Sequence, residues 1–132
     1  MANIYILKNT RRQAAVKITG TGYGNVSYTD IKYADQTIPL TSAGNLSWPI
    51  TDIVYDVGNS ANVTRNGNIV FAMNAGQNYV GLTKDIGVAL DEVANANVVV
   101  NLGATQGTVI LQFSKSVGFN DPDRQILQQP DR

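Results

Sequence analysis

Turn-forming residues recur at short intervals along most of this chain, and brief runs rich in Val, Ile, Tyr and Thr lie between them. Such runs, bounded by Gly, Asn, Asp and Pro, are typical of many short strands in a sandwich or barrel. The 132 residues fit one domain that buries roughly two-thirds of the surface exposed by its unfolded form. The sequence therefore predicts an all-β protein, a β-sandwich or jelly-roll-like single domain with extended N- and C-terminal arms.

Three segments give single strands. Residues 13–19 alternate apolar and polar side chains, as a strand with one buried face should. Residues 25–33 are predicted as a strand with a bulge or break near Asp30, because the apolar positions change parity there. Residues 48–57 form a further predicted strand, and we expect Trp48 to anchor the core rather than to serve as a ligand platform.

The clearest local signal is a hairpin. Residues 61–65 and 68–73 are separated by Asn66-Gly67, the pair best able to adopt the two positive φ values of a type I′ turn. This turn fixes a register in which Val63 and Val70 share one face of the hairpin. The predicted pairs are Arg65 with Asn68, Thr64 with Ile69, Val63 with Val70, and Asn62 with Phe71.

A second hairpin is predicted between residues 97–102 and 108–114, joined by residues 103–107. In both arms apolar residues occupy both alternating sets of positions, which predicts that both faces of each strand are buried. Between the two hairpins, residues 84–96 are compatible with a helix or with a strand and loop. The second reading is favoured, because Gly87 weakens a helix by about 1 kcal/mol relative to Ala.

The two ends of the chain differ from its centre. Residues 1–12 contain an adhesive apolar run, expected either to close the sandwich or to pair with another subunit's sheet edge. Residues 118–132 are polar and proline-containing, so we expect a tail that is disordered or ordered only against a neighbouring chain. The sandwich itself is expected to span 13–117. The candidate interface residues are Ile4, Tyr5, Ile6, Leu7, Arg11 and Arg12 at the first end, and Ile126 and Leu127 at the second.

The chain has no His and no Cys, which excludes the usual Ser/His, Cys/His and zinc arrangements. Carboxylate pairs such as Asp52 with Asp56, or Asp91 with Glu92, could in principle serve glycoside hydrolysis, but the chain has one Trp and one Glu and offers few sugar platforms. We therefore expect solvated carboxylates and no enzyme activity.

Cofactor and metal sites are not expected either. Residues 20–24, Gly-Thr-Gly-Tyr-Gly, superficially resemble a phosphate-binding loop, but a β-like Asn-Val-Ser-Tyr follows instead of a helix. A plain glycine-rich turn is the favoured reading. Asp121 and Asp123 lack the further acidic residues that a calcium site requires, so a turn in the tail is expected.

Charge limits the possible partners. The net charge is +0, so the chain lacks the broad positive field of most nucleic-acid-binding proteins, and no apolar run is long enough to span a membrane. Only 15% of residues are charged, against about 25% in typical soluble domains, which suits a surface partly covered by neighbours. Lys8, Arg11 and Arg12 form the basic cluster, interpreted as a solvated strand end or as a site that docks onto an acidic surface.

Three stretches carry a family resemblance. Trp-x-Ile-x-x-Ile at 48–53, Val-Thr-Arg-Asn-Gly at 63–67 and Gly-Thr-Val-Ile-Leu-Gln-Phe-Ser-Lys-Ser-Val-Gly-Phe at 107–119 resemble small virion proteins of tailed bacteriophages, cyanophages in particular. The resemblance implies a non-enzymatic β-sandwich or jelly-roll subunit located in the virion after synthesis in the host cytoplasm. It implies a capsid decoration (cement) protein that contacts the major capsid protein or other virion proteins in many copies or as a homo-oligomer.

Other functions remain open at this point. A neck or tail component of a phage would have much the same sequence. A carbohydrate-binding β-sandwich and a carboxylate-based hydrolase are alternatives from other classes. The hydrolase is the least favoured, because the chain has only one Trp and one Glu to supply sugar platforms and a general acid.

Overall fold

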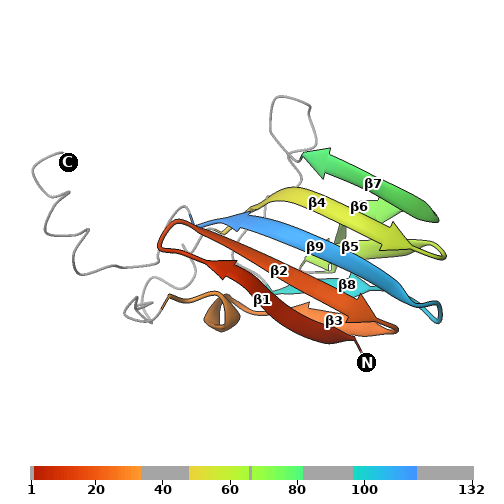
Figure 1. The fold of residues 1–132 in the computed structure, drawn as a ribbon, viewed down its shortest axis with the longest axis horizontal. Helices are drawn as coiled ribbons and strands as arrows, with labels where there is room; N and C mark the ends of the chain where they lie inside the picture. Colours follow the sequence, from red (N-terminus) through yellow and green to blue (C-terminus); the bar gives the residue numbers. More distant parts are fainter. Residues whose placement is uncertain (1, 34–47, 66, 82–96, 116–132) are drawn as a thin grey trace, which may run out of the picture.

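The computed structural model describes residues 2–33, 48–65, 67–81 and 97–115. Within these ranges the chain forms nine strands and one short 3-10 helix, η1 (Figure 1). The strands are β1 (Asn3–Asn9), β2 (Gln13–Gly20), β3 (Tyr23–Val26), β4 (Ile50–Val57), β5 (Ala61–Arg65), β6 (Asn68–Met73), β7 (Gly76–Gly81), β8 (Val98–Asn101) and β9 (Gly107–Ser114), and η1 spans Tyr28–Asp30.

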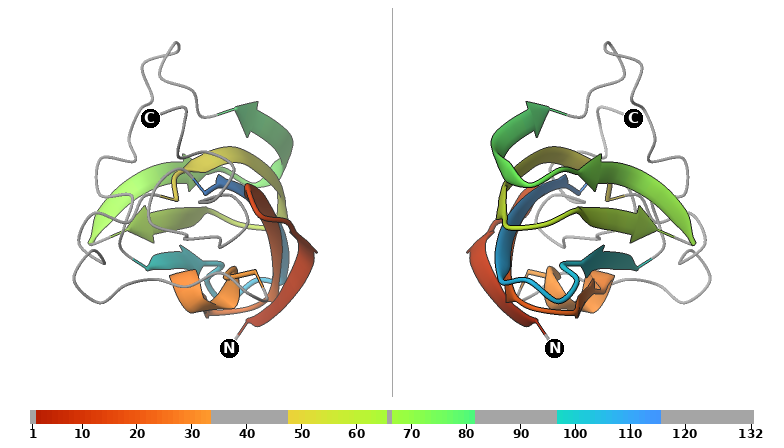
Figure 2. Two further views of the ribbon diagram at one scale, coloured as in Figure 1. Left: turned by 90° about the vertical axis from the view of Figure 1, so that its left-hand side faces the viewer. Right: turned by 90° about the vertical axis from the view of Figure 1, so that its right-hand side faces the viewer.

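The strands form two antiparallel sheets packed face to face (Figure 2). One sheet has the order β1-β2-β9-β4-β7, and the other has the order β3-β8-β5-β6. Without β1, each sheet has four strands, and the chain crosses between sheets at every connection except that from β5 to β6. This double Greek-key order is that of a jelly roll. The predicted fold class, an all-β jelly-roll sandwich, is confirmed.

The core lies between the sheets because their strands alternate buried and partly exposed side chains. In β9 the inward residues Val109, Leu111 and Phe113 are completely buried. Trp48, just before β4, is also completely buried, and its ring centroid lies 5.1 Å from that of Phe113. The prediction that Trp48 anchors the core is therefore confirmed.

The Asn66-Gly67 hairpin forms as predicted near its turn. Gly67 has φ +80°, and Arg65 pairs with Asn68 and Thr64 with Ile69. Beyond these pairs the predicted register is wrong, because a bulge between Val63 and Thr64 shifts the ladder by one residue. The bulge places Val63 opposite Phe71, and yet both Val63 and Val70 remain buried. The observed remaining pairs are Val63 with Phe71, Asn62 with Ala72, and Ala61 with Met73.

The second predicted hairpin is wrong. Strand β8 pairs with β3 and β5 in one sheet, whereas β9 pairs with β2 and β4 in the other. The chain turns away after β8 at Gly103, which has φ +72° and whose carbonyl accepts a hydrogen bond from Gly22 N at 2.7 Å. The predicted burial on both faces is also wrong, because only one face of each strand is fully buried; Val99 and Ile110, on the other face, are half-buried.

The predicted strand over 25–33 ends early, at Val26. Ser27 caps η1: its hydroxyl accepts a hydrogen bond from Thr29 N, and its own N–H donates to Asp30 Oδ2 at 2.8 Å. This capping box satisfies backbone groups that a strand would have paired with a neighbour. The helical turn accounts for the parity change before Ile31, whose side chain is buried.

Some predictions fall outside the described residues, namely the helix or strand over 84–96 and the tail 118–132. No helix in the described part of the chain is long and apolar enough to cross a membrane.

Candidate interaction surfaces

Strand β1 is an edge strand of the five-stranded sheet, paired with β2 through a short turn. Ile4 packs against the core, whereas Tyr5, Ile6 and Leu7 are 51%, 43% and 52% exposed. The register shifts between Ile6 and Lys8, so the strand is bulged where it is most apolar. The segment thus closes the chain's own sheet and still presents apolar side chains along an outer edge, where strands of other chains can add.

The turn between β1 and β2 presents two of the predicted interface residues. Thr10 fixes the turn, because its N–H donates to the carbonyl of Gln13 at 2.8 Å and its Oγ1 accepts from Gln13 N at 3.1 Å. Arg11 is half-buried with its guanidinium 5.0 Å from the ring centre of Tyr33, and Arg12 is exposed. The cation–π contact holds Arg11 along the protein surface.

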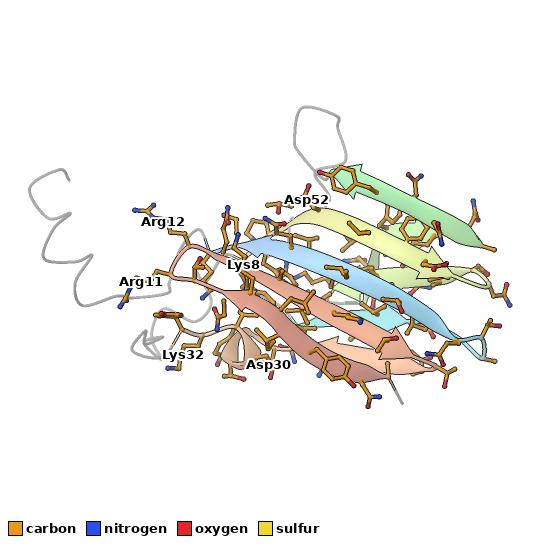
Figure 3. The ribbon with its side chains drawn as sticks, viewed as in Figure 1. Lys8, Arg11, Arg12, Asp30, Lys32 and Asp52 are labelled. Carbon is orange, nitrogen blue, oxygen red and sulfur yellow. The ribbon has the colours of Figure 1, made fainter. Side chains whose placement is uncertain are left out.

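Basic side chains gather at this end of the sandwich. Lys8, Arg11, Arg12 and Lys32 lie together there, with Asp30 nearby (Figure 3). A shallow pocket of about 480 Å³ is lined by Thr10, Arg11, Arg12, Gln13 and Tyr33. The structure therefore extends the basic cluster of the sequence by Lys32 and adds the aromatic ring of Tyr33 beside it, both distant along the chain.

Lys115 adds a buried cation to the same end. Its Nζ donates to Asn9 Oδ1 and to the Thr10 carbonyl, both at 2.6 Å, and lies 5.9 Å from the ring centre of Tyr33. Burial, followed by the nearby positive charge of Lys32, lowers the pKa of Lys115 from its usual 10.5 to about 8. Lys115 thus ties the end of β9 to the turn after β1.

The outer face of the five-stranded sheet carries a second surface. Tyr79 on β7 is 61% exposed, and its hydroxyl donates to Asp52 Oδ1 at 2.5 Å. This hydrogen bond, followed by the charge of Asp52, raises the pKa of Tyr79. Beside this pair a shallow depression of about 510 Å³ opens over β4, β7 and β9. Its lining residues are Val54, Tyr55, Asp56, Gln77, Asn78, Tyr79, Thr108 and Ile110.

Asp52 and Asp56, proposed from the sequence as a catalytic carboxylate pair, each accept hydrogen bonds from neighbouring side chains. Asp52 accepts hydrogen bonds from Tyr79 and from Thr51 Oγ1, and Asp56 accepts one from Gln77 Nε2 at 3.0 Å. Across the ranges that the structure describes, no group of three or more His, Cys, Asp or Glu could hold a metal ion. Asp91, Glu92, Asp121 and Asp123 lie outside those ranges.

The glycine-rich segment 20–24 runs from the last residue of β2 through a turn at Thr21 and Gly22 into the first two residues of β3, so a strand follows and not a helix. Gly20 and Gly22 have φ values of +126° and +79°, which favour glycine. The segment is a turn. Ile126 and Leu127, the predicted anchors of the tail, are outside the described residues.

Comparisons with known proteins give no family. No protein-family model and no curated protein matches the chain. Similar solved structures include KdgF from Halomonas sp., with a TM-score of 0.41 and 12% identity over 88% of this chain and 82% of that chain. They also include an RmlC-like cupin protein from Desulfovibrio desulfuricans, with a TM-score of 0.38 and 6% identity over 88% of this chain and 84% of that chain.

A third similar structure is a cupin superfamily protein from Desulfitobacterium hafniense DCB-2, with a TM-score of 0.37 and 10% identity over 89% of this chain and 79% of that chain. Such low identities and TM-scores carry no argument about chemistry.

Proposed function

We propose that the chain is a non-enzymatic structural protein of a phage particle, a decoration protein that stabilises the shell by binding the major capsid protein. The observation that carries this proposal is the outer edge of β1, where Tyr5, Ile6 and Leu7 are largely exposed. Natural sheets usually protect such edges with charge, bulges or covering segments, because an exposed apolar edge pairs with other chains. Strand β1 has a bulge and ends near Lys8, and yet Tyr5, Ile6 and Leu7 leave apolar side chains exposed along it. An edge strand that remains apolar suits a protein whose task is to bind another subunit.

The basic end supports the same proposal. Lys8, Arg11 and Arg12 directly adjoin the apolar edge, so one surface offers apolar contact and positive charge together (Figure 3). Charges at the rim of an interface mainly speed association and select the partner, whereas apolar contact contributes more of the affinity. We therefore expect the partner's surface to offer an unpaired strand edge with acidic residues beside it.

The sequence resemblance to small phage virion proteins and the jelly-roll topology are compatible with this role, since jelly rolls serve in viral capsids as well as in lectins and cupins. Topology does not decide among these functions. A neck or tail component is the second candidate, because it would use the same kind of edge contact on a different part of the particle. The carbohydrate-binding alternative stays a prediction.

The proposal is tested with particles of the encoding phage that lack this chain. Replacing Ile6 and Leu7 together by Lys should reduce binding of the added protein to these particles at least tenfold, roughly the effect of removing one interface hot spot. The matched control is Ile69→Lys, since Ile69 is as exposed but lies on β6 of the other sheet. Undiminished binding by the double variant, with circular dichroism showing both variants folded, contradicts the proposed contact.

A further inference from the structure

One row of side chains crosses the outer face of the whole five-stranded sheet. The ladder places Tyr5 opposite Lys17, Lys17 opposite Ile110, Ile110 opposite Val54, and Val54 opposite Tyr79. Residues directly opposite in antiparallel strands project to the same side of the sheet. We call these five residues the outer row. Figure 1 looks onto this face, with β9 at its centre.

The outer row is apolar except at one position. Val54 is 42% exposed, Ile110 is half-buried, and a tyrosine stands at either end. Lys17 on β2 is the charged member, and on β4 Asp52 and Asp56 flank Val54 in the adjacent rows. Positive and negative charge therefore lie on opposite sides of the central strand β9.

This distribution of charge complements itself under a two-fold rotation about an axis parallel to β9 and lying above the face. The rotation places a second copy's β4 over β2, so that Lys17 of one copy faces Val54 of the other, between Asp52 and Asp56 of that copy. Ile110 meets Ile110 at the centre. Tyr5 of each copy meets Tyr79 of the other, and like charges do not face each other within the row.

The available area is sufficient for such a contact. Five strands about 4.8 Å apart cover a width of about 24 Å, and strands of six to eight residues extend about 25 Å on average. Each copy would bury about 600 Å², or about 1,200 Å² in total, which is the lower end of the range for specific interfaces. Two sheets pack face to face at about 10 Å with their strands nearly aligned, as this rotation requires.

We propose that the outer face of the five-stranded sheet is a two-fold interface between two copies of this chain, centred on Ile110 with Lys17 set between the carboxylates of Asp52 and Asp56. The inference goes beyond the decoration role, since it concerns the purified chain in solution and does not depend on the particle that the β1 edge binds. A two-fold contact of this kind is isologous, so each pair of facing residues occurs twice.

The test exchanges charge across the interface. The purified full chain should sediment as a dimer at about 100 µM, where a dimer with a Kd of about 10 µM is mostly formed. Lys17→Asp should raise the dimer Kd about 100-fold, because its carboxylate would face two others, and the double variant Asp52→Lys with Asp56→Lys should do the same by opposing Lys17. Each variant alone should therefore be a monomer.

The decisive measurement uses an equimolar mixture of the two variants. In the mixed pair, Asp at 17 faces two Lys, and the second copy's Lys17 faces the native Asp52 and Asp56, so both contacts are again complementary. The mixture should regain the dimer in sedimentation velocity, while Ile69→Lys on the other sheet should leave the wild-type dimer unchanged. A monomeric wild type, a dimeric Lys17→Asp variant, or a mixture that stays monomeric would overturn the proposal.

Discussion

Replacing Trp48 by Ala is expected to lower the free energy of unfolding by about 3–5 kcal/mol. The indole is completely buried against Phe113, and the Arg65 guanidinium lies 4.3 Å from its ring centre on a side chain that is itself buried. Truncation would leave a large cavity and remove the aromatic face that Arg65 contacts. Urea unfolding followed by circular dichroism measures the loss.

Trp48→Phe is the matched control. Among the described residues, Trp48 Nε1 is a buried donor without a hydrogen-bond partner, so Phe keeps an aromatic ring and removes an unsatisfied polar group. We expect less than half the loss seen with Ala. An Ala variant no less stable than Ile69→Ala, whose side chain is exposed, would show that Trp48 does not anchor the core.

Replacing Lys115 by Met is expected to lower the free energy of unfolding by about 1–3 kcal/mol at pH 7, because it leaves Asn9 Oδ1 and the Thr10 carbonyl without their charged donor. The folded-state pKa of about 8 lies below the unfolded value of 10.5. Between these values the unfolded chain binds more protons, so the contribution of Lys115 to stability increases with pH. Below pH 8 the amine is charged in both states and the contribution is constant.

The difference between wild type and Lys115→Met isolates this titration from all others. The difference in the free energy of unfolding between the two proteins should grow by at most about 1.4 kcal/mol per pH unit from pH 8 to 10.5, and it should level off outside this window. Lys32→Gln should raise the pKa of Lys115, read from the Cε chemical shift, because it removes a neighbouring positive charge. A pH-independent difference would contradict the lowered pKa.

Local patterns predicted much of this fold. The alternation in β2 and the Asn66-Gly67 turn act over a few residues, so the sequence contains their whole cause. Trp48 could also be assigned to the core, because it is a large, mainly apolar side chain close in the sequence to Ile50 and Ile53. The jelly-roll class follows from many such short strands, each too small to be stable alone.

The errors concern partners distant in the chain. Residues 97–102 and 108–114 read as one hairpin because they are adjacent and apolar, but β8 and β9 each gain two neighbours by joining different sheets. The bulge in β6 likewise has no local sequence signal: Val70, the extra residue that no residue of β5 opposes, is buried together with Met73 in the core beneath the strand.

The candidate surfaces were predictable only in part. Tyr5, Ile6 and Leu7 are recognisable because they form one contiguous apolar run near a basic turn. The outer row is not recognisable, because its members come from five strands and meet only through the register of four ladders. Lys115, between two serines, has no sequence signal for burial; its oxygen partners come from the other end of the chain.

The proposed virion role is tested most directly by the copy number of this chain in purified particles of the phage proposed to encode it, measured by quantitative mass spectrometry against the major capsid protein. A decoration protein should be present in numbers comparable with the shell subunits. A number comparable with the portal would favour the neck or tail candidate instead, and absence of the chain from the particles would contradict a structural role in the virion.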